Sequence, residues 1–231
     1  MGILKRVAKK LIYNTLPSSH VLMFHHVTAK PEIPQSGCLL DYEKFRDFVL
    51  RFQGRYATLE DVVKKRAKHK IAITFDDGLA DLHTLAYPFL KERGIPFTAF
   101  IITDFIDKPG YITTQQLKEM SCDPLVTIGS HGVTHELLPN LDTEQKQREL
   151  CESQKKLQEI TGRKIDIFAY SHGKFDRETL NLMRCYDYGM SVKGAPLNCL
   201  TFRKYLIPRF NIDATTFEKM SALFKKQILD I

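Results

Sequence analysis

The apolar residues of the chain alternate between two spacings, one typical of strands and one typical of helices. The run over residues 71–75 is almost entirely apolar, as is a strand that is covered on both faces. Other runs of similar length share this character and are interpreted as strands as well. The predicted strands are Val21–Phe24, Ile71–Phe75, Phe97–Ile102, Leu125–Ile128, Ile165–Ala169, Gly189–Val192 and Tyr205–Ile207.

Between most of these runs, apolar residues recur at the spacing of an amphipathic helix. Capping signals support several of these helices: Asp41, Thr58 and Asp142 stand where a helix would begin, and Gly94 and Gly162 where one would end. The predicted helices are Tyr42–Phe52, Leu59–Lys65, Leu79–Arg93, Thr114–Met120, Thr143–Ile160, Arg177–Tyr186 and Ala214–Leu229.

Strands that alternate with helices over about seven units favour an α/β fold with a parallel sheet, either open or closed into a barrel. The chain has 231 residues, which is enough for one domain with a sizeable core. No long linker, repeat or low-complexity tract interrupts it, so we expect a single domain over residues 1–231. The segment Thr28–Leu40, which contains Pro31 and Pro34, is interpreted as a surface loop.

Residues 1–16 have a pattern of their own. Their apolar residues fall on one helical face and their basic residues mostly on the other, which predicts a basic amphipathic helix. Such a helix can pack its apolar stripe on the domain, or it can lie on a membrane surface. The sequence leaves both interpretations open.

Composition and charge narrow the range of partners. The chain is 43% hydrophobic and 26% charged, as globular proteins are, and carries a formal net charge of +7. This charge suits an anionic membrane surface or a phosphate-bearing substrate, although it also fits a merely basic surface. The basic residues are spread along the chain without a recognised motif, so we expect no nucleic-acid partner.

The cysteines and the hydropathy of the chain indicate the cellular compartment in which we expect it. The five cysteines are odd in number and form no C-x-x-C, which favours free thiols in a reducing compartment. No run of 18 apolar residues and no secretory signal is evident. We therefore expect a cytoplasmic protein, which the helix over residues 1–16 could bring to the inner membrane face.

Polar residues with reactive side chains follow several of the predicted strands. In α/β barrels the active site is built at the carboxyl ends of the strands, so these side chains are expected to share one mouth. The candidates are His25, His26, Asp76, Asp77, His131, His172 and Arg209.

Two short motifs are the most specific among them. T-F-D-D-G ends with Asp76, Asp77 and Gly78, and S-H-G-V-T-H places His131 and His135 four residues apart. One acid and both histidines can bind a divalent cation, while the other acid takes a proton from a water that the cation activates. Each motif alone could be structural, since Asp-Gly also favours tight turns. Together they predict a hydrolytic metal site.

With the opening V-L-M-F-H-H-V, these motifs resemble the polysaccharide deacetylase family, carbohydrate esterase family 4, over roughly residues 21–212. The opening is similar to the L-M-Y-H-x-V start of the branch that acts on surface polysaccharides. The resemblance implies a distorted (β/α) barrel and metal-dependent removal of an N-acetyl or O-acetyl group from a sugar.

The resemblance also implies a separate role for each of these residues. It implies that Asp76 is the general base and that Asp77, His131 and His135 bind the metal, with Zn as the default and Co, Ni or Fe also suited to these ligands. The stretch L-I-P-R resembles the family's late L-P-R segment, and its Arg209 would pair with the catalytic carboxylate.

The sequence offers three candidates for the general acid that protonates the leaving group. Alignment to L-M-Y-H favours His25, but His26 is adjacent, and strand alternation lets only one of them point into the mouth. The family commonly has a Tyr-Pro-Tyr-Gly-like segment where this chain has Tyr170-Ser171-His172-Gly173. The backbone N–H of His172 can still stabilise an oxyanion, and its imidazole is a third candidate for the acid.

The expected substrate is an N-acetylated glycan or a lipid-linked sugar intermediate. Two alternatives stay open. One is a catalytically silent barrel that binds an anionic glycan or a membrane surface, and the other is a metal-dependent amidase for a non-sugar substrate.

Overall fold

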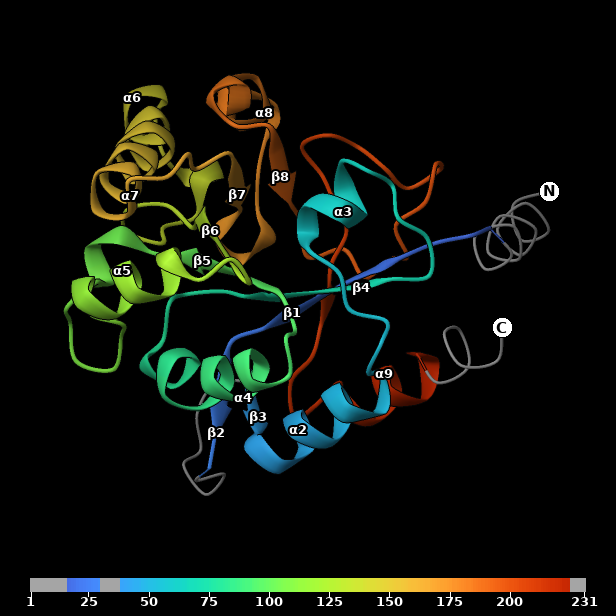
Figure 1. Cartoon of the computed structure of the whole chain (residues 1–231). Helices are drawn as coiled ribbons and strands as arrows, with labels where there is room; N and C mark the ends of the chain where they lie inside the picture. The colour runs from blue at the N-terminus through green and yellow to red at the C-terminus, as the bar shows by residue number, and fades with distance from the viewer. Residues whose placement is uncertain (1–15, 30–37, 225–231) are drawn as a thin grey trace, which may run out of the picture.

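The computed structural model describes residues 16–29 and 38–224. Its main strands are β1 (His20–Phe24), β4 (Ile71–Phe75), β5 (Phe97–Ile101), β6 (Val126–Ser130), β7 (Ile167–Ala169), β8 (Tyr188–Met190) and β9 (Phe210–Asn211). Within the described ranges these seven form one sheet in the order β8-β7-β6-β5-β4-β1-β9, and every neighbouring pair is parallel. The sheet is curled and most of the helices lie outside it (Figure 1), which confirms the predicted distorted (β/α) barrel.

The helices follow the predicted pattern. The side chains of Asp41, Thr58 and Asp142 each accept the backbone N–H three residues on, and Gly162 ends a helix with a φ of +66°. The α-helices are α2 (Tyr42–Arg51), α3 (Leu59–Val63), α4 (Tyr87–Glu92), α5 (Thr114–Cys122), α6 (Thr143–Gln147), α7 (Ser153–Thr161), α8 (Arg177–Leu182) and α9 (Phe217–Phe224). The π-helical segments η1 (Leu82–Ala86) and η4 (Arg148–Glu152) lead into α4 and α7, and the 3-10 turns are η2 (Thr103–Phe105), η3 (Leu138–Asn140), η5 (Ser171–Gly173) and η6 (Met183–Cys185).

Four sequence predictions include residues outside the described ranges. The helix over residues 1–16 lies outside them except for residue 16, as does the part of the predicted helix Ala214–Leu229 beyond residue 224. The single domain over residues 1–231 therefore stays a prediction. The ends of the predicted loop Thr28–Leu40 belong instead to β2 (His26–Thr28) and β3 (Leu39–Asp41), which pair in parallel as a separate two-stranded sheet.

The cysteine and hydropathy patterns agree with the structure as far as it reaches. All five cysteines are free thiols, as the odd number and the missing C-x-x-C predict. Over residues 16–29 and 38–224, every helix is too short or too polar to cross a membrane.

The strands separate two hydrophobic clusters, because successive side chains of a strand point to opposite faces. The larger cluster fills the space between the sheet and the outer helices, where Phe24 packs in a T-shape against Phe45 of α2. The smaller cluster brings together Val21 of β1 and Met190 of β8, from opposite halves of the sheet. It therefore lies inside the curl. Helix α3, which lies apart from the other helices in Figure 1, covers it.

The inner rows of side chains lead directly to the predicted site. Asp76 lies four residues after Ala72 and points to the same inner face of the sheet. His131 lies two residues after Gly129, which pairs in register with Phe100 of the inner cluster, so His131 points inward as well. A Cβ atom at Gly129 would lie 2.5 Å from the Phe100 ring, so glycine leaves the room that this ring needs. The strand register therefore aims Asp76 and His131 into the mouth, which we define as the open end of the barrel at the carboxyl ends of its strands.

The predicted strand Tyr205–Ile207 is wrong. This stretch contributes an isolated parallel bridge between Ile207 and Met190, and Pro208 then interrupts the ladder because it has no N–H. Strand β9 follows and pairs with β1 in the other half of the sheet. One short segment thus contacts both β8 and β1, and Arg209 lies between its two pairings rather than after a strand.

Candidate active site

Asp76 and Arg209 form a buried bidentate ion pair in the mouth. Arg209 Nη1 donates to Asp76 Oδ1 at 2.6 Å and Nη2 donates to Oδ2 at 2.8 Å, while Nε donates to the Ser191 carbonyl at 3.2 Å. Burial by itself would raise the pKa of Asp76, but the charges of Arg209 and His131 outweigh it and hold that pKa below its usual value. Asp76 is therefore an oriented carboxylate that is ionised at neutral pH.

Asp77, His131 and His135 converge beside this pair. Asp77 Oδ1 lies 3.4 Å from His131 Nε2 and 3.5 Å from His135 Nε2, and one donor atom from each residue lies within 4.8 Å of the others. His131 Nδ1 donates to the Ala169 carbonyl at 2.8 Å, which leaves Nε2 as the nitrogen that faces Asp77. Strand ends β4, β6 and β7 thus all contribute to the cluster.

The cluster fits a divalent cation. Asp77 Oδ1 is buried and accepts no hydrogen bond, although two imidazole nitrogens face it. Ligand atoms at about 2.1 Å from a tetrahedral metal are about 3.4 Å apart, which matches these distances. Burial and the charge of a protonated His131 lower the pKa of His135 to about 4, so His135 is a neutral imidazole at neutral pH. Burial would lower the pKa of His131, but Asp76 and Asp77 outweigh it and raise that pKa, and a bound cation would displace the proton.

Three residues of the mouth have left-handed backbone conformations that favour glycine. The φ angles are +71° at Asp77, +68° at His135 and +53° at His172. Simple strand alternation would turn Asp77 away from Asp76, and the left-handed turn returns its carboxylate to the same mouth. Backbone strain of this kind is concentrated at functional sites.

His25 and His26 separate as strand alternation requires. His26 Nδ1 is hydrogen-bonded to Asp81 Oδ2 at 2.7 Å, and this bond raises the pKa of His26. Burial lowers the pKa of His25, opposed by the nearby charges of Asp76 and Asp77. His25 follows Phe24, whose carbonyl accepts the Asp76 N–H at 2.9 Å, so it lies beside Asp76 at the strand ends, while Asp81 holds the ring of His26.

His172 also borders the mouth. Its exposed imidazole lies 4.5 Å from the ring of His135, measured between centroids, and its left-handed backbone forms the η5 turn directly after β7. The structure thus brings every predicted site residue to one mouth: Asp76, Asp77, His131, His135, Arg209, His25 and His172.

Glu149 is a site residue that the sequence analysis missed. It is 3% exposed and lies in η4, where its carboxylate accepts the Val133 N–H at 2.7 Å, the Thr134 N–H at 3.1 Å and the Thr134 hydroxyl at 2.7 Å. A Cβ atom at Gly132, whose φ is +86°, would lie 2.6 Å from Glu149 Oε2. Glu149 therefore holds the loop between His131 and His135. The sequence did offer one signal for it, because Glu149 is an acidic residue on the apolar face of the predicted helix Thr143–Ile160.

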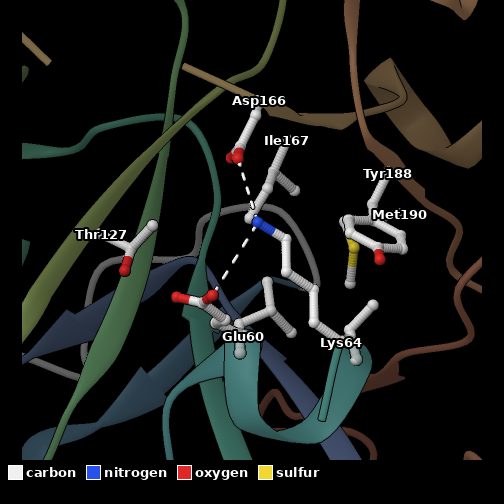
Figure 2. Close-up of a pocket in the computed structure, with 9 residues that line it drawn as sticks. Glu60, Lys64, Thr127, Asp166, Ile167, Tyr188 and Met190 are labelled. Atoms are coloured by element: carbon white, nitrogen blue, oxygen red, sulfur yellow. Dashed lines mark hydrogen bonds and ion pairs between the residues drawn. The ribbon is translucent and has the colours of Figure 1, made fainter. Parts of the chain in front are cut away.

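A pocket of about 60 Å³ lies at the opposite end of the barrel (Figure 2). It is lined by α3 and by residues at the amino ends of β6, β7 and β8, such as Thr127 and Tyr188. Figure 2 shows Lys64 between Glu60 and Asp166, with nitrogen–oxygen distances of 3.9 and 3.3 Å. Because its charged groups pair with one another and its volume is small, we assign the chemistry to the mouth and not to this pocket.

Comparisons with known proteins point to one family. The family model described as polysaccharide deacetylase matches residues 63–191, which is more than half of the chain and includes the acid pair and the histidine motif. YxkH of Bacillus subtilis is 34% identical over 133 residues, which cover 58% of this chain and 47% of that protein. A poly-beta-1,6-N-acetyl-D-glucosamine N-deacetylase of Staphylococcus aureus is 27% identical over 192 residues, 72% of this chain and 64% of that protein.

This chain thus spans about half to two thirds of the length of these two relatives. Among solved structures, the Streptococcus pyogenes deacetylase PplD in complex with acetate has a TM-score of 0.80 at 20% identity, covering 92% of this chain and 99% of that one. At this identity the likeness shows the fold, and it agrees with the barrel described above.

Glu149→Ala is expected to loosen the histidine loop, because it leaves the backbone N–H groups of Val133 and Thr134 buried without an acceptor. We expect a loss of about 2–4 kcal/mol in the free energy of unfolding, measured with urea, and faster hydrogen exchange at these two amides. Glu152→Ala is the control, since Glu152 is exposed in the same segment and should change stability by less than about 0.5 kcal/mol. Equal effects of the two substitutions would contradict the role given to Glu149.

Proposed function

The chain belongs to the polysaccharide deacetylase family, and from that premise we propose that it is a metal-dependent enzyme that hydrolyses N-acetyl groups of a glycan. One observation carries the proposal. Asp77 Oδ1 accepts no hydrogen bond and faces two imidazole nitrogens at 3.4 and 3.5 Å, beside a second carboxylate that Arg209 holds in place. One acid is thus available to a cation and the other to a proton.

Asp77, His131 and His135 would hold the cation, and Zn²⁺ suits two imidazoles and a carboxylate, as Co, Ni or Fe also would. When bound, the cation would polarise the acetyl carbonyl and acidify the attacking water. The hydrogen bond from His131 Nδ1 to the Ala169 carbonyl fixes the tautomer and the ring orientation that such binding needs.

Asp76 is the proposed general base. Its ionised carboxylate can accept the proton of the water that attacks the acetyl carbon. The bidentate contact with Arg209 fixes the direction from which it does so. The water oxygen then joins the acetyl carbon, the C–N bond breaks and acetate leaves. The amine that departs with the sugar must gain a proton.

His25 is the proposed general acid for that proton. It follows Phe24, which pairs with Phe75 and accepts the Asp76 N–H, so it lies beside Asp76, whereas the ring of His26 is held by Asp81. The backbone N–H of His172 is the proposed further donor to the oxygen of the acetyl group, and its side chain is the second candidate for the acid because it borders the mouth beside His135.

The proposed substrate is a glycan that contains N-acetylated hexosamine, free or lipid-linked. The name of the Staphylococcus aureus relative supports this choice, since that protein is a poly-beta-1,6-N-acetyl-D-glucosamine N-deacetylase. An O-acetyl group, or the amide of a non-sugar compound, would suit the same chemistry. The paired base and ligand set argues against a silent binding barrel. Cytoplasmic location and contact of residues 1–16 with the inner membrane face remain proposals from the sequence.

Removal of any ligand side chain is expected to abolish both metal binding and acetate release. Asp77→Ala, His131→Ala and His135→Ala should each lose the metal measured by mass spectrometry, and acetate release from N-acetylglucosamine oligomers should fall at least about 100-fold. The control is His83→Ala, which removes a histidine paired with Glu119 away from the mouth. Metal-free protein with full activity, or equal metal loss in the control, would refute the assignment.

The acid can be identified by changing the leaving group. An amine must be protonated as it leaves, whereas the phenolate of 4-nitrophenyl acetate leaves unaided. We expect His25→Ala to lower deacetylation of the amide substrate about 10²- to 10⁴-fold and hydrolysis of the aryl ester by less than about tenfold. His26→Ala and His172→Ala are the parallel variants. If the leaving-group dependence appears only in His172→Ala, the acid role belongs to His172 and the present assignment is wrong.

A further inference from the structure

The loop between β5 and α5 is fastened to the acid motif. Ala80 N donates to the Gly110 carbonyl and Ile112 N donates to the Gly78 carbonyl, both at 2.9 Å. Between these bonds, Tyr111 forms an antiparallel bridge with Leu79, which is two residues beyond Asp77. The backbone of Tyr111 is therefore fixed beside the metal motif.

Two aromatic rings of this loop lie together at its surface. Tyr111 and Phe105 are both partly exposed, and their ring centroids are 4.8 Å apart in a T-shaped arrangement. The ammonium group of Lys108 lies 4.8 Å from the centroid of Phe105 and covers that ring further. Burial and the carboxylate of Asp77 raise the pKa of the Tyr111 hydroxyl, which agrees with its place near the cation site.

A fixed aromatic ring beside an acetyl-hydrolysing site suits a sugar. A pyranose ring has an apolar C–H face that gains from contact with an aromatic ring, while its hydroxyl groups stay in water. Phe105 braces Tyr111, so little side-chain freedom is lost when a ligand binds. None of the steps assigned to the mouth uses either ring.

We propose that Tyr111, braced by Phe105, forms a sugar subsite that packs against the pyranose ring of the residue being deacetylated. This inference rests on the proposed function, because it assumes that the mouth acts on a glycan. It assigns Tyr111 a part in substrate specificity and no part in the chemical step.

The test compares a substrate that has a sugar ring with one that has none. N-acetylglucosamine pentasaccharides with β-1,4 and β-1,6 linkages provide the ring, and ethyl acetate provides only the acetyl group. We expect Tyr111→Ala to raise the KM for the active pentasaccharide about five- to tenfold with kcat nearly unchanged, and to leave ethyl acetate hydrolysis unchanged. Tyr111→Phe keeps the ring and should restore the KM.

Tyr188→Ala is the control, because it removes an aromatic ring from the pocket at the other end of the barrel. An equal loss of rate on both substrates would mean that Tyr111 supports the metal site, and no change on either would mean that it contacts no sugar. Both results overturn the inference while the proposed function stands.

Saturation-transfer NMR of pentasaccharide binding separates the two proposals. If the wild-type protein binds the sugar but does not hydrolyse it, and Tyr111→Ala weakens that binding, the inference holds and the proposed function fails. If the wild-type protein binds neither pentasaccharide, the inference is overturned.

Discussion

The buried ion pair between Asp76 and Arg209 is the interaction on which the rest of the site depends. Removing either charge from water costs several kcal/mol, so each group is tolerable there only while the other is present. Asp76 comes from β4 and Arg209 from the segment that contacts both β8 and β1. The contact between Asp76 and Arg209 therefore orients the proposed base and also holds the segment over residues 207–211, which joins β8 to β1.

A second buried carboxylate organises the other half of the site by different means. Glu149 accepts only neutral N–H and O–H donors, and these belong to the loop that carries the histidines. Arg209 thus holds Asp76, the proposed base, through its guanidinium group, and Glu149 separately holds the loop between His131 and His135 through backbone and hydroxyl donors. The mouth is ordered by the protein itself, which is what metal binding and catalysis both require.

The sequence predicted the barrel and the site because both follow from local patterns. Apolar runs define the strands, and parallel strands bring Asp76 and His131 to one end. It could not predict that Ile207 pairs with β8 while β9 pairs with β1, because those contacts are long-range. Pro208 also separates β9 from the apolar run before it, so this short strand has no clear pattern. The alternation of side chains along a strand showed that His25 and His26 must point in different directions. It could not show which of them enters the mouth, because Asp81, which binds the ring of His26, is 55 residues away in the sequence.

The most direct test of the account is the metal content and the acetate release of Asp76→Asn, measured on the same folded sample. The substitution removes the base but none of the three proposed ligands. We predict that the metal remains bound and that acetate release from an N-acetylglucosamine oligomer falls about 10²- to 10⁴-fold. Full activity of the metal-bound variant would contradict the central claim that Asp76 takes the proton while Asp77, His131 and His135 hold the metal.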